Sequence, residues 1–396
     1  MLKRIKKAVL TVMVFSLCGC SGTADKKPAG ENYTIYIGTD LHYISPQLTD
    51  YGPLFTEMIE TGDGKLTEHT EEIANAFVET VLKERPDAVI LSGDLTFNGE
   101  MLSLKDLKSK LDKLRDAGIK VLVIPGNHDI AYGFAARYEG YAVFKADQIS
   151  QQQFREIMSG YGMDGALSKD SSSFSYVYEL RDDLWLLALD CNTEAEPGSV
   201  SSGTLRWAEL QLKKAKESGA HVISVTHQNV LPQSSMLADG FIISNASQVQ
   251  SVLKSGGVQL NLSGHSHLQH VSQEDGLTDI CTESMSVYPL RYGILNIDKE
   301  GNAVYSKHHL DLLQDEAYER FTARTREQTA DLLEDRDIPD DLKKKMADFA
   351  VDMNTAYFSG ELDPETDYRS MEEWKLWEQY AKDTFWYFYF NSMLDQ

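Results

Sequence analysis

Residues 33–42 read Tyr33-Thr34-Ile35-Tyr36-Ile37-Gly38-Thr39-Asp40-Leu41-His42. The apolar part of this segment predicts a buried strand that ends just before Asp40. The acid and His42 follow two residues apart, and in an extended segment such residues point to the same side. Because open α/β sheets bind their ligands beyond the carboxyl ends of strands, the segment predicts both a core strand and part of a functional site.

Two more segments repeat this pattern of an apolar run followed by polar residues. Asp94 follows the apolar residues 88–91, and Asn127 follows the apolar residues 120–124. Apolar residues at helical spacing predict one helix at about 67–83 and another between the two runs. The alternation of strands and helices indicates a parallel α/β arrangement.

The later part of the α/β region is predicted to form a second sheet. Its expected elements are a hairpin of residues 174–180 and 184–189, a helix from about 205 to 215, strands at 221–225 and 258–262, and further strands from about 285 to 309 that close this sheet. Residues 130–170 are predicted to form a loop over the site, with a short helix near residues 150–158. The alternative is a surface insertion without a role.

From about Leu313 onward the pattern becomes entirely helical. One apolar helical face, residues 342–357, ends before Gly360, and another spans residues 374–388. The aromatic run 385–390 is apolar on every side. It is interpreted as a helix packed on the α/β body, with contact to a lipid interface or to a partner as the alternative.

Seven residues of metal-binding type follow the predicted strands in five short motifs. They are Asp40 and His42, Asp94, Asn127, His227, and His265 with His267. Carboxylates, imidazoles and a carboxamide are the ligands that a pair of divalent or mixed-valence ions needs. A carboxylate can hold two ions at once, so Asp94 is predicted to bridge them, while Asn127 offers a neutral oxygen.

The formal charge of this set predicts an anionic substrate. The seven side chains sum to about −2, so two divalent ions would leave the site near +2, and a bridging hydroxide would lower that to about +1. Two ions roughly 3.5–4 Å apart can hold the nucleophile and the phosphoryl oxygens of an in-line displacement. They also lower the pKa of bound water, so hydroxide exists near neutral pH. A phosphoester anion complements such a site.

His128 directly follows Asn127 but is not one of the seven. A histidine in this place can donate a proton to the leaving alkoxide. Asp129 is predicted to fix the orientation of the His128 ring, as carboxylates do for imidazoles. These two residues are therefore the predicted catalytic pair.

The N-terminal residues predict export. Four basic residues precede a short apolar run that is too short for a normal membrane span. The run ends in Leu17-Cys18-Gly19-Cys20, which resembles the lipobox of bacterial lipoproteins, where the signal is removed before a lipid-bearing cysteine. We therefore expect residues 1–19 to be a signal peptide, Cys20 to carry a lipid, and residues 20–32 to tether the protein outside the bacterial cell membrane. Ordinary secretion and an uncleaved anchor are the alternatives.

Charge and cysteine content add two expectations. Removal of residues 1–19 takes away four positive and no negative charges, which moves the formal charge from −23 to −27. Such an acidic surface repels phosphates, so no stable nucleic-acid partner is expected. Export permits a disulfide between Cys191 and Cys281, but two free thiols are the favoured interpretation.

The five motifs resemble those of the calcineurin-like metallophosphoesterases. The D-x-H, G-D, G-N-H-[DE], lone His and G-H-x-H motifs of that family all occur here in order, over roughly residues 33–310. The resemblance implies an α/β fold, a two-sheet αββα sandwich at 33–310 with an all-helical C-terminal extension at 311–396. It also implies two divalent or mixed-valence metal ions, Mn, Fe or Zn.

The same resemblance implies two ligand sets that share Asp94. The first set would be completed by Asp40, His42 and His267, and the second by Asn127, His227 and His265. His128 would contact the substrate or its leaving group. The segment 91–100, the leader and the helical extension also resemble bacterial lipoproteins of this family described as cyclic-nucleotide phosphodiesterases.

We therefore predict an enzyme that hydrolyses small phosphodiesters such as cyclic nucleotides by means of a metal-bridging hydroxide. A phosphomonoesterase or nucleotidase with the same site is one alternative, because metal ions treat both ester types alike. An inactive surface binding protein, with the aromatic C-terminal helices as its interaction module, is another. The intact set of ligands argues against the inactive scaffold.

Overall fold

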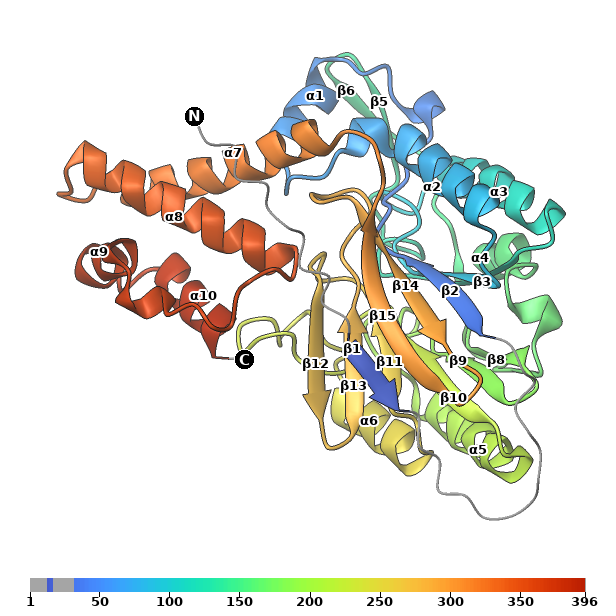
Figure 1. Cartoon of the computed structure of the whole chain (residues 1–396). Coiled ribbons are helices and arrows are strands. Elements are labelled where there is room, and N and C mark those ends of the chain that lie inside the picture. Colours follow the sequence, from blue (N-terminus) through green and yellow to red (C-terminus); the bar gives the residue numbers. More distant parts are fainter. Residues whose placement is uncertain (1–12, 17–31, 396) are drawn as a thin grey trace.

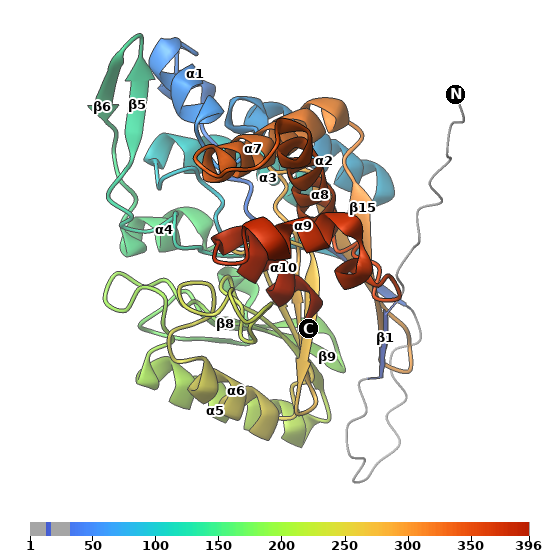
Figure 2. The same cartoon turned by 90° about the vertical axis from the view of Figure 1, so that its left-hand side faces the viewer.

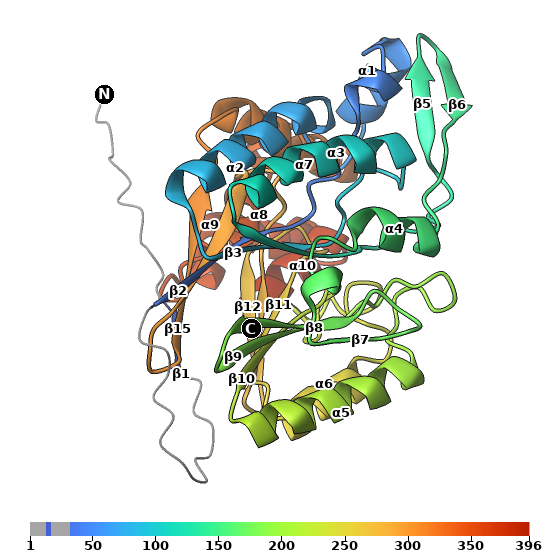
Figure 3. The same cartoon turned by 90° about the vertical axis from the view of Figure 1, so that its right-hand side faces the viewer.

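The computed structural model describes residues 13–16 and 32–395. Two β-sheets lie face to face, and helices cover their outer faces (Figures 1 and 3). The helices on the two outer faces are α2 (Thr70–Glu84) and α3 (Met101–Asp116) on the first sheet, and α5 (Ser202–Ser218) and α6 (Ala246–Ser255) on the second. This is the two-sheet αββα sandwich that the sequence predicts.

The first sheet has the strand order β1-β15-β14-β2-β3-β4. Its strands are β1 (Met13–Ser16), β2 (Tyr33–Gly38), β3 (Ala88–Ser92), β4 (Lys120–Ile124), β14 (Arg291–Ile297) and β15 (Asn302–His309). Strands β2, β3 and β4 run parallel, with Gly38 opposite Leu91 and Ser92 opposite Ile124. Their carboxyl ends therefore lie along one edge of the sheet.

Strands β14 and β15 belong to this first sheet, and the prediction that residues 285–309 close the second sheet is wrong. β14 pairs antiparallel with β2, with Leu295 opposite Ile35, and β15 pairs antiparallel with β14. An apolar strand pattern shows which face is buried, but it does not specify which sheet supplies the partner strand.

The second sheet has the order β12-β13-β11-β10-β9-β8-β7. Its strands are β7 (Ser168–Lys169), β8 (Tyr176–Arg181), β9 (Leu184–Ala188), β10 (His221–Val225), β11 (Leu260–Ser263), β12 (His270–Glu274) and β13 (Leu277–Cys281). The predicted hairpin is confirmed as the antiparallel pair β8–β9. Strands β9, β10 and β11 run parallel, as the predicted α/β alternation requires.

Both faces of the central strands are buried, which explains their continuous apolar runs. In β9, Leu186 lies in the core between the sheets, while its neighbour Leu187 packs in the core under α5 and α6. In β10, Ile223 likewise lies in the core between the sheets, and Val222 packs in the core under α5 and α6. Successive side chains thus serve opposite faces of the sheet.

The segment 130–170 forms more structure than a loop. β5 (Ala136–Glu139) and β6 (Ala142–Lys145) make a separate two-stranded hairpin that projects beside α1 (Pro53–Glu60) (Figures 2 and 3). The predicted short helix is confirmed as α4 (Gln151–Met158), which begins with a capping box between Ser150 and Gln153. Short 3₁₀ helices lie at Pro46–Leu48 (η1), Thr67–His69 (η2), Met163–Gly165 (η3) and Tyr368–Ser370 (η4).

The C-terminal residues are helical, as predicted. The helices are α7 (Gln314–Leu333), α8 (Asp340–Phe358), α9 (Glu372–Tyr380) and α10 (Phe385–Leu394). The apolar face of residues 374–388 is thus divided between two helices rather than one. Phe390 of α10 packs against Trp377 and Phe349, with ring centroids 5.1 and 5.5 Å apart, so the aromatic run contributes to a core within the helices.

The helical region is tied to the α/β body by polar contacts. The Arg320 guanidinium on α7 donates to both carboxylate oxygens of Glu68, at 2.9 and 2.5 Å. Arg291 on β14 donates to the Ser359 carbonyl at 3.1 Å and to Glu361 at 2.6 Å, just beyond α8. These charge-assisted bonds link β14 and the 3₁₀ turn η2 to the helices.

Most of the expected signal peptide, together with Cys20 and nearly all of the tether, lies outside the described residues. Strand β1 pairs antiparallel with β15. Within the described ranges, every helix is too short or too polar to cross a membrane.

Candidate metal centre

Five loops meet beyond the carboxyl ends of β2, β3, β4, β10 and β11. Each of the seven predicted ligands lies two to four residues past the end of its strand. The side chains of Asp40, His42 and His267 form one compact group, and those of Asp94, His227 and His265 form another. The structure therefore brings together residues that are scattered over much of the chain.

The backbone at these residues is left-handed rather than extended. The φ angles are 51° at Asp40, 48° at His42, 48° at Asp94, 68° at His265 and 58° at His267. The prediction that Asp40 and His42 point to the same side because their segment is extended is therefore wrong, although both side chains do face the centre. Such backbone is costly for residues other than glycine, and clusters of it are characteristic of functional sites.

Two glycines allow the loops to approach one another closely. Gly93 has a φ of 97°, and a Cβ atom built there would lie 2.5 Å from Nδ1 of His227. A Cβ atom on Gly126 would lie 2.1 Å from Oδ1 of Asp94. Any side chain at either position would push a predicted ligand out of place, so both glycines are required by space, and Gly93 is required by its conformation as well.

Asp94 lies at the middle of the centre. Its Oδ2 atom is 3.7 Å from Nε2 of His42 and 3.4 Å from Nε2 of His227. The carboxylate is therefore flanked by one histidine from each group. Its other oxygen, Oδ1, accepts a hydrogen bond from the His128 backbone nitrogen at 2.8 Å, which fixes the orientation of the carboxylate.

The first group surrounds Asp40. Its Oδ1 atom lies 3.4 Å from Nε2 of His267 and 3.9 Å from Nε2 of His42, and these two ring nitrogens are 3.1 Å apart. Oδ2 of Asp40 accepts hydrogen bonds from Thr39 Oγ1 at 2.7 Å and from the His265 backbone nitrogen at 2.9 Å. The second oxygen thus holds the loops together while the first faces the histidines.

The second group contains His227, Asn127 and His265. Oδ1 of Asn127 is 3.0 Å from Nε2 of His227, whose Nδ1 donates to the Ser92 carbonyl at 2.8 Å. This backbone bond fixes the tautomer that leaves Nε2 free for a ligand. Nε2 of His265 donates to the Gly240 carbonyl at 2.9 Å, so Nδ1 is the nitrogen available for a metal ion.

The acids and imidazoles of the centre shift one another's pKa values. Burial raises the pKa of Asp94, but the charges on His227 and His128 outweigh burial and hold that pKa well below its usual range. Burial lowers the pKa of His227, yet Asp94 and Asp40 raise it to about 9. Burial and the charge on His227 lower the pKa of His265 to about 4. The buried carboxylates of the centre are therefore stabilised by nearby positive charge, which a bound cation would supply.

The residues present fit bound metal ions. Oδ1 of Asp40, the oxygen that faces the histidines, is buried and has no hydrogen-bond partner among the described residues. Nitrogen atoms of His42 and His267 face each other at 3.1 Å, a separation that a shared ion would explain. Carboxylate oxygens, imidazole nitrogens and one carboxamide oxygen form a donor set that suits Mn, Fe or Zn.

Asp129 does not orient His128, and that prediction is wrong. Its buried carboxylate instead accepts hydrogen bonds from the backbone nitrogens of Leu95, Thr96 and Gly126, at 3.1, 2.8 and 2.8 Å, and from the Thr96 hydroxyl at 2.7 Å. Asp129 thus joins the loop after β4 to the loop after β3. The sequence motif placed it beside His128, but its side chain turns the other way.

His128 is oriented by other residues. Its Nδ1 donates to the Phe97 carbonyl at 2.8 Å, and its Nε2 lies 4.0 Å from Oδ2 of Asp94. The ring also stacks on Tyr132, with centroids 4.2 Å apart and planes inclined by 29°. Tyr132 is not among the predicted site residues. The signal that could have found it is an aromatic residue four positions after His128, at the start of the segment predicted to cover the site.

Two further predictions concern cysteines near the centre. Cys191 and Cys281 are both free thiols and buried, as favoured from the sequence. Burial raises the pKa of the Cys191 thiol to about 12, so it stays protonated. Residues 190–192 are buried, and Asn192 exchanges side-chain hydrogen bonds with Gln228 at 2.9 Å, next to His227.

One more group of metal-binding type lies apart from the centre, at Glu68, His69 and Glu316. His69 lies 3.1 Å from Glu316, and Glu68 is already paired with Arg320. These contacts connect α7 to the α/β body, so the group has a structural explanation.

Comparison with known proteins gives two family matches. Residues 33–269 match the calcineurin-like phosphoesterase family, and residues 303–396 match the C-terminal domain of cyclic nucleotide phosphodiesterase. The second match begins inside β15, so it includes part of a strand of the first sheet. The fold, the five ligand loops and the first match agree, and the chain belongs to the calcineurin-like phosphoesterase family.

Individual relatives cover parts of the chain. A probable cyclic nucleotide phosphodiesterase from Ruthia magnifica subsp. Calyptogena magnifica is 25% identical over 48% of this chain and 66% of its own length. A probable glycerophosphodiester phosphodiesterase from Arcobacter nitrofigilis is 37% identical over 38% of this chain and 47% of its own length. The chain thus spans under two thirds of each of these curated relatives. A dimetal phosphatase structure from Danio rerio has 15% identity and a TM-score of 0.48, covering 69% of this chain and 98% of that one.

Proposed function

We propose that this chain is a dinuclear metal-dependent phosphodiesterase that acts on small diesters such as cyclic nucleotides. The observation that carries the proposal is the position of Asp94, whose Oδ2 lies 3.7 Å from His42 and 3.4 Å from His227. A single carboxylate between two histidine-rich groups suits two ions that share one ligand. Matches to a cyclic nucleotide phosphodiesterase domain and to relatives named phosphodiesterases support the substrate class.

The proposed ligands form two sets. Asp40, His42 and His267 would hold one ion together with Asp94, and Asn127, His227 and His265 would hold the other together with Asp94. When bound, two such ions lower the pKa of water and neutralise charge on a phosphoester. The bonds from Thr39 to Asp40 and from His227 to the Ser92 carbonyl keep donor atoms directed at the centre before any ion arrives.

His128 is the proposed proton donor. Its Nδ1 is engaged by the Phe97 carbonyl, so Nε2 is the nitrogen directed toward Asp94 and the reacting phosphoester. A proton on Nε2 can pass to the oxygen of the leaving alcohol. Stacking on Tyr132 limits rotation of the imidazole ring. Asp129 is proposed as a positioning residue that holds the loops of Asp94 and Asn127 together.

The direct test is hydrolysis of bis(p-nitrophenyl) phosphate by the purified full chain loaded with Mn²⁺, followed by a screen of 2′,3′- and 3′,5′-cyclic nucleotides, phosphomonoesters and lipid head-group diesters. We expect turnover of diesters and bound metal by elemental analysis. Faster turnover of monoesters would favour the phosphomonoesterase alternative. Neither turnover nor bound metal would favour an inactive binding scaffold.

We also propose that the protein is exported and held outside the bacterial cell membrane by a lipid on Cys20. The basic residues, short apolar run and lipobox-like segment at residues 1–20 support this proposal. The test is fractionation of cells that express the wild type or Cys20→Ser. We expect the wild type in the membrane fraction and the variant outside it, whereas equal distribution would contradict lipid attachment.

A further inference from the structure

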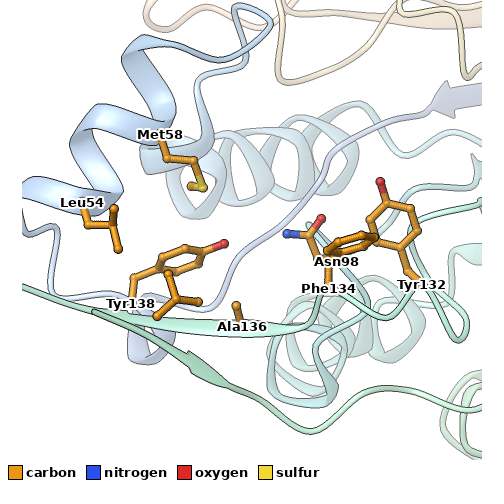
Figure 4. Close-up of a pocket in the computed structure, with 8 residues that line it drawn as sticks. Leu54, Met58, Asn98, Tyr132, Phe134, Ala136 and Tyr138 are labelled. Carbon is orange, nitrogen blue, oxygen red and sulfur yellow. The ribbon is translucent and has the colours of Figure 1, made fainter. Parts of the chain in front are cut away.

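A cavity of about 460 Å³ lies beside the metal centre, between α1 and the inserted hairpin. It is lined by Leu54, Met58, Asn98, Tyr132, Phe134, Ala136, Tyr138 and Val143. Figure 4 shows Asn98, Phe134 and Tyr132 on one side and Leu54, Met58 and Tyr138 on the other. Its volume falls within the range of small-molecule sites, and its lining is mostly apolar with one carboxamide, as is common for such sites.

Neighbouring aromatic side chains extend from the centre to the cavity. Nε2 of His128 lies 4.0 Å from Asp94, the His128 ring stacks on Tyr132 at 4.2 Å, and Tyr132 lies 5.2 Å from Phe134 by ring centroids. A phosphoester held near Asp94 with its leaving oxygen at His128 would direct its organic group past Tyr132. The remainder of such a substrate would extend into the cavity.

Gln148 holds together the wall of the cavity that contains Asn98 and Phe134. Its Oε1 accepts hydrogen bonds from the backbone nitrogens of Gly133 and Ala135, on either side of Phe134, at 2.9 and 3.4 Å. Its Nε2 donates to the Gly99 carbonyl at 3.0 Å, next to Asn98. These bonds fix Phe134 relative to Asn98 in the absence of a ligand, which lowers the entropic cost of binding.

We propose that this cavity binds the planar base of a nucleotide phosphodiester; this inference rests on the proposed function. Aromatic rings stack on any base, and a carboxamide such as that of Asn98 offers both a donor and an acceptor to a base edge. None of the eight lining residues is charged, so the cavity does not suit a second phosphate. Aromatic rings also suit a quaternary ammonium group, which is why choline is the competitor in the first test. Phe134 exposes 68% of its surface and Val143 exposes 57%, area that a bound base would cover.

The first test measures binding without metal or turnover. The purified metal-free full chain is titrated with adenosine by saturation-transfer NMR, with choline as competitor, for the wild type, Phe134→Ala and Tyr141→Ala. Tyr141 is a matched control because it belongs to the same inserted segment, is 85% exposed and does not line the cavity. We expect Phe134→Ala to weaken adenosine binding at least about 5-fold, with no effect of choline or of Tyr141→Ala. The inference would be overturned if the wild type does not bind adenosine or if choline displaces adenosine. It would also be overturned if Phe134→Ala binds adenosine with unchanged affinity.

The second test separates the cavity from the chemistry. For the Mn²⁺-loaded full chain, kcat/KM is measured for 2′,3′-cyclic AMP and for ribose 2′,3′-cyclic phosphate, which has no base. We expect Phe134→Ala to lower the ratio of the two values at least about 5-fold and Tyr141→Ala to leave it unchanged. If both diesters are hydrolysed but Phe134→Ala leaves the ratio of their kcat/KM values unchanged, the cavity assignment fails and the proposed function stands. If neither is hydrolysed, the proposed function fails, and adenosine binding still decides the role of the cavity.

Discussion

Oδ1 of Asp129 accepts hydrogen bonds from both the backbone nitrogen and the hydroxyl of Thr96, at 2.8 and 2.7 Å. Its other oxygen accepts from the backbone nitrogens of Leu95 and Gly126. One buried carboxylate therefore satisfies four donors from two loops. Because these loops carry Asp94 and Asn127, the contact of Asp129 with Thr96 fixes two proposed ligands relative to each other.

Replacing Asp129 with Asn should destabilise the protein by about 2–4 kcal/mol, because an amide nitrogen cannot accept the hydrogen bonds of one carboxylate oxygen and leaves buried donors unpaired. The measurement is urea unfolding of the metal-free chain. Asp116→Asn, at an exposed position at the end of α3, is the matched control. A change below about 0.5 kcal/mol in Asp129→Asn would contradict the bracing role.

Replacing His128 with Ala should leave both metal ions bound and slow the hydrolysis of diesters with poor leaving groups by about 10²–10⁴-fold, because the proton donor is lost. Diesters with a p-nitrophenoxide leaving group need little protonation and should be affected far less. Metal content by elemental analysis and rates for a series of leaving groups are the measurements. Loss of metal from His128→Ala would show that the residue acts as a ligand instead.

The buried carboxyl group of Glu100 should make the free energy of unfolding depend on pH. Burial raises its pKa from 4.5 to about 7, partly offset by the hydrogen bond that its Oε2 accepts from the Asn98 backbone nitrogen. Between pH 4.5 and about 7, the Glu100 carboxyl holds a proton in the folded chain that it has lost in the unfolded chain. Its contribution to stability is therefore fully present below pH 4.5 and is lost as the pH rises through about 7. Glu100→Gln is neutral at every pH. Its free energy of unfolding, relative to the wild type, should rise by up to about 3 kcal/mol between pH 4.5 and pH 8.

Urea unfolding at a series of pH values measures that change. Glu139→Gln, at an exposed position in the hairpin strand β5, is the matched control. A difference between Glu100→Gln and the wild type that stays constant over the pH range would show that the Glu100 carboxyl is already ionised in the folded protein.

Local patterns in the sequence predicted the strands that carry the proposed ligands. The apolar runs before Asp40, Asp94 and Asn127 became β2, β3 and β4, and the run before His227 became β10. These predictions succeed because a doubly covered parallel strand has a continuous apolar signature and its functional residues follow at its carboxyl end. The convergence of the loops was likewise foreseeable from their order along the chain.

Features that depend on distant partners were not foreseeable. The left-handed backbone of Asp40 and His42 persists because the surrounding loops hold it, and the local sequence does not specify this conformation. The pairing of β14 with β2, the turn of Asp129 away from His128, and the stacking of Tyr132 all depend on contacts between segments far apart or on side-chain direction. Sequence periodicity contains no information about such choices.

The most direct test of the central claim is metal content, measured by elemental analysis and by anomalous scattering from crystals grown with Mn²⁺, for the wild type and for Asp94→Asn. We predict two ions per wild-type chain, one on each side of Asp94. The variant should hold at most one ion, with kcat/KM for diesters lowered more than about 100-fold. A wild-type chain that binds fewer than two ions, or an Asp94→Asn variant that keeps two ions and full activity, would contradict a shared dinuclear centre.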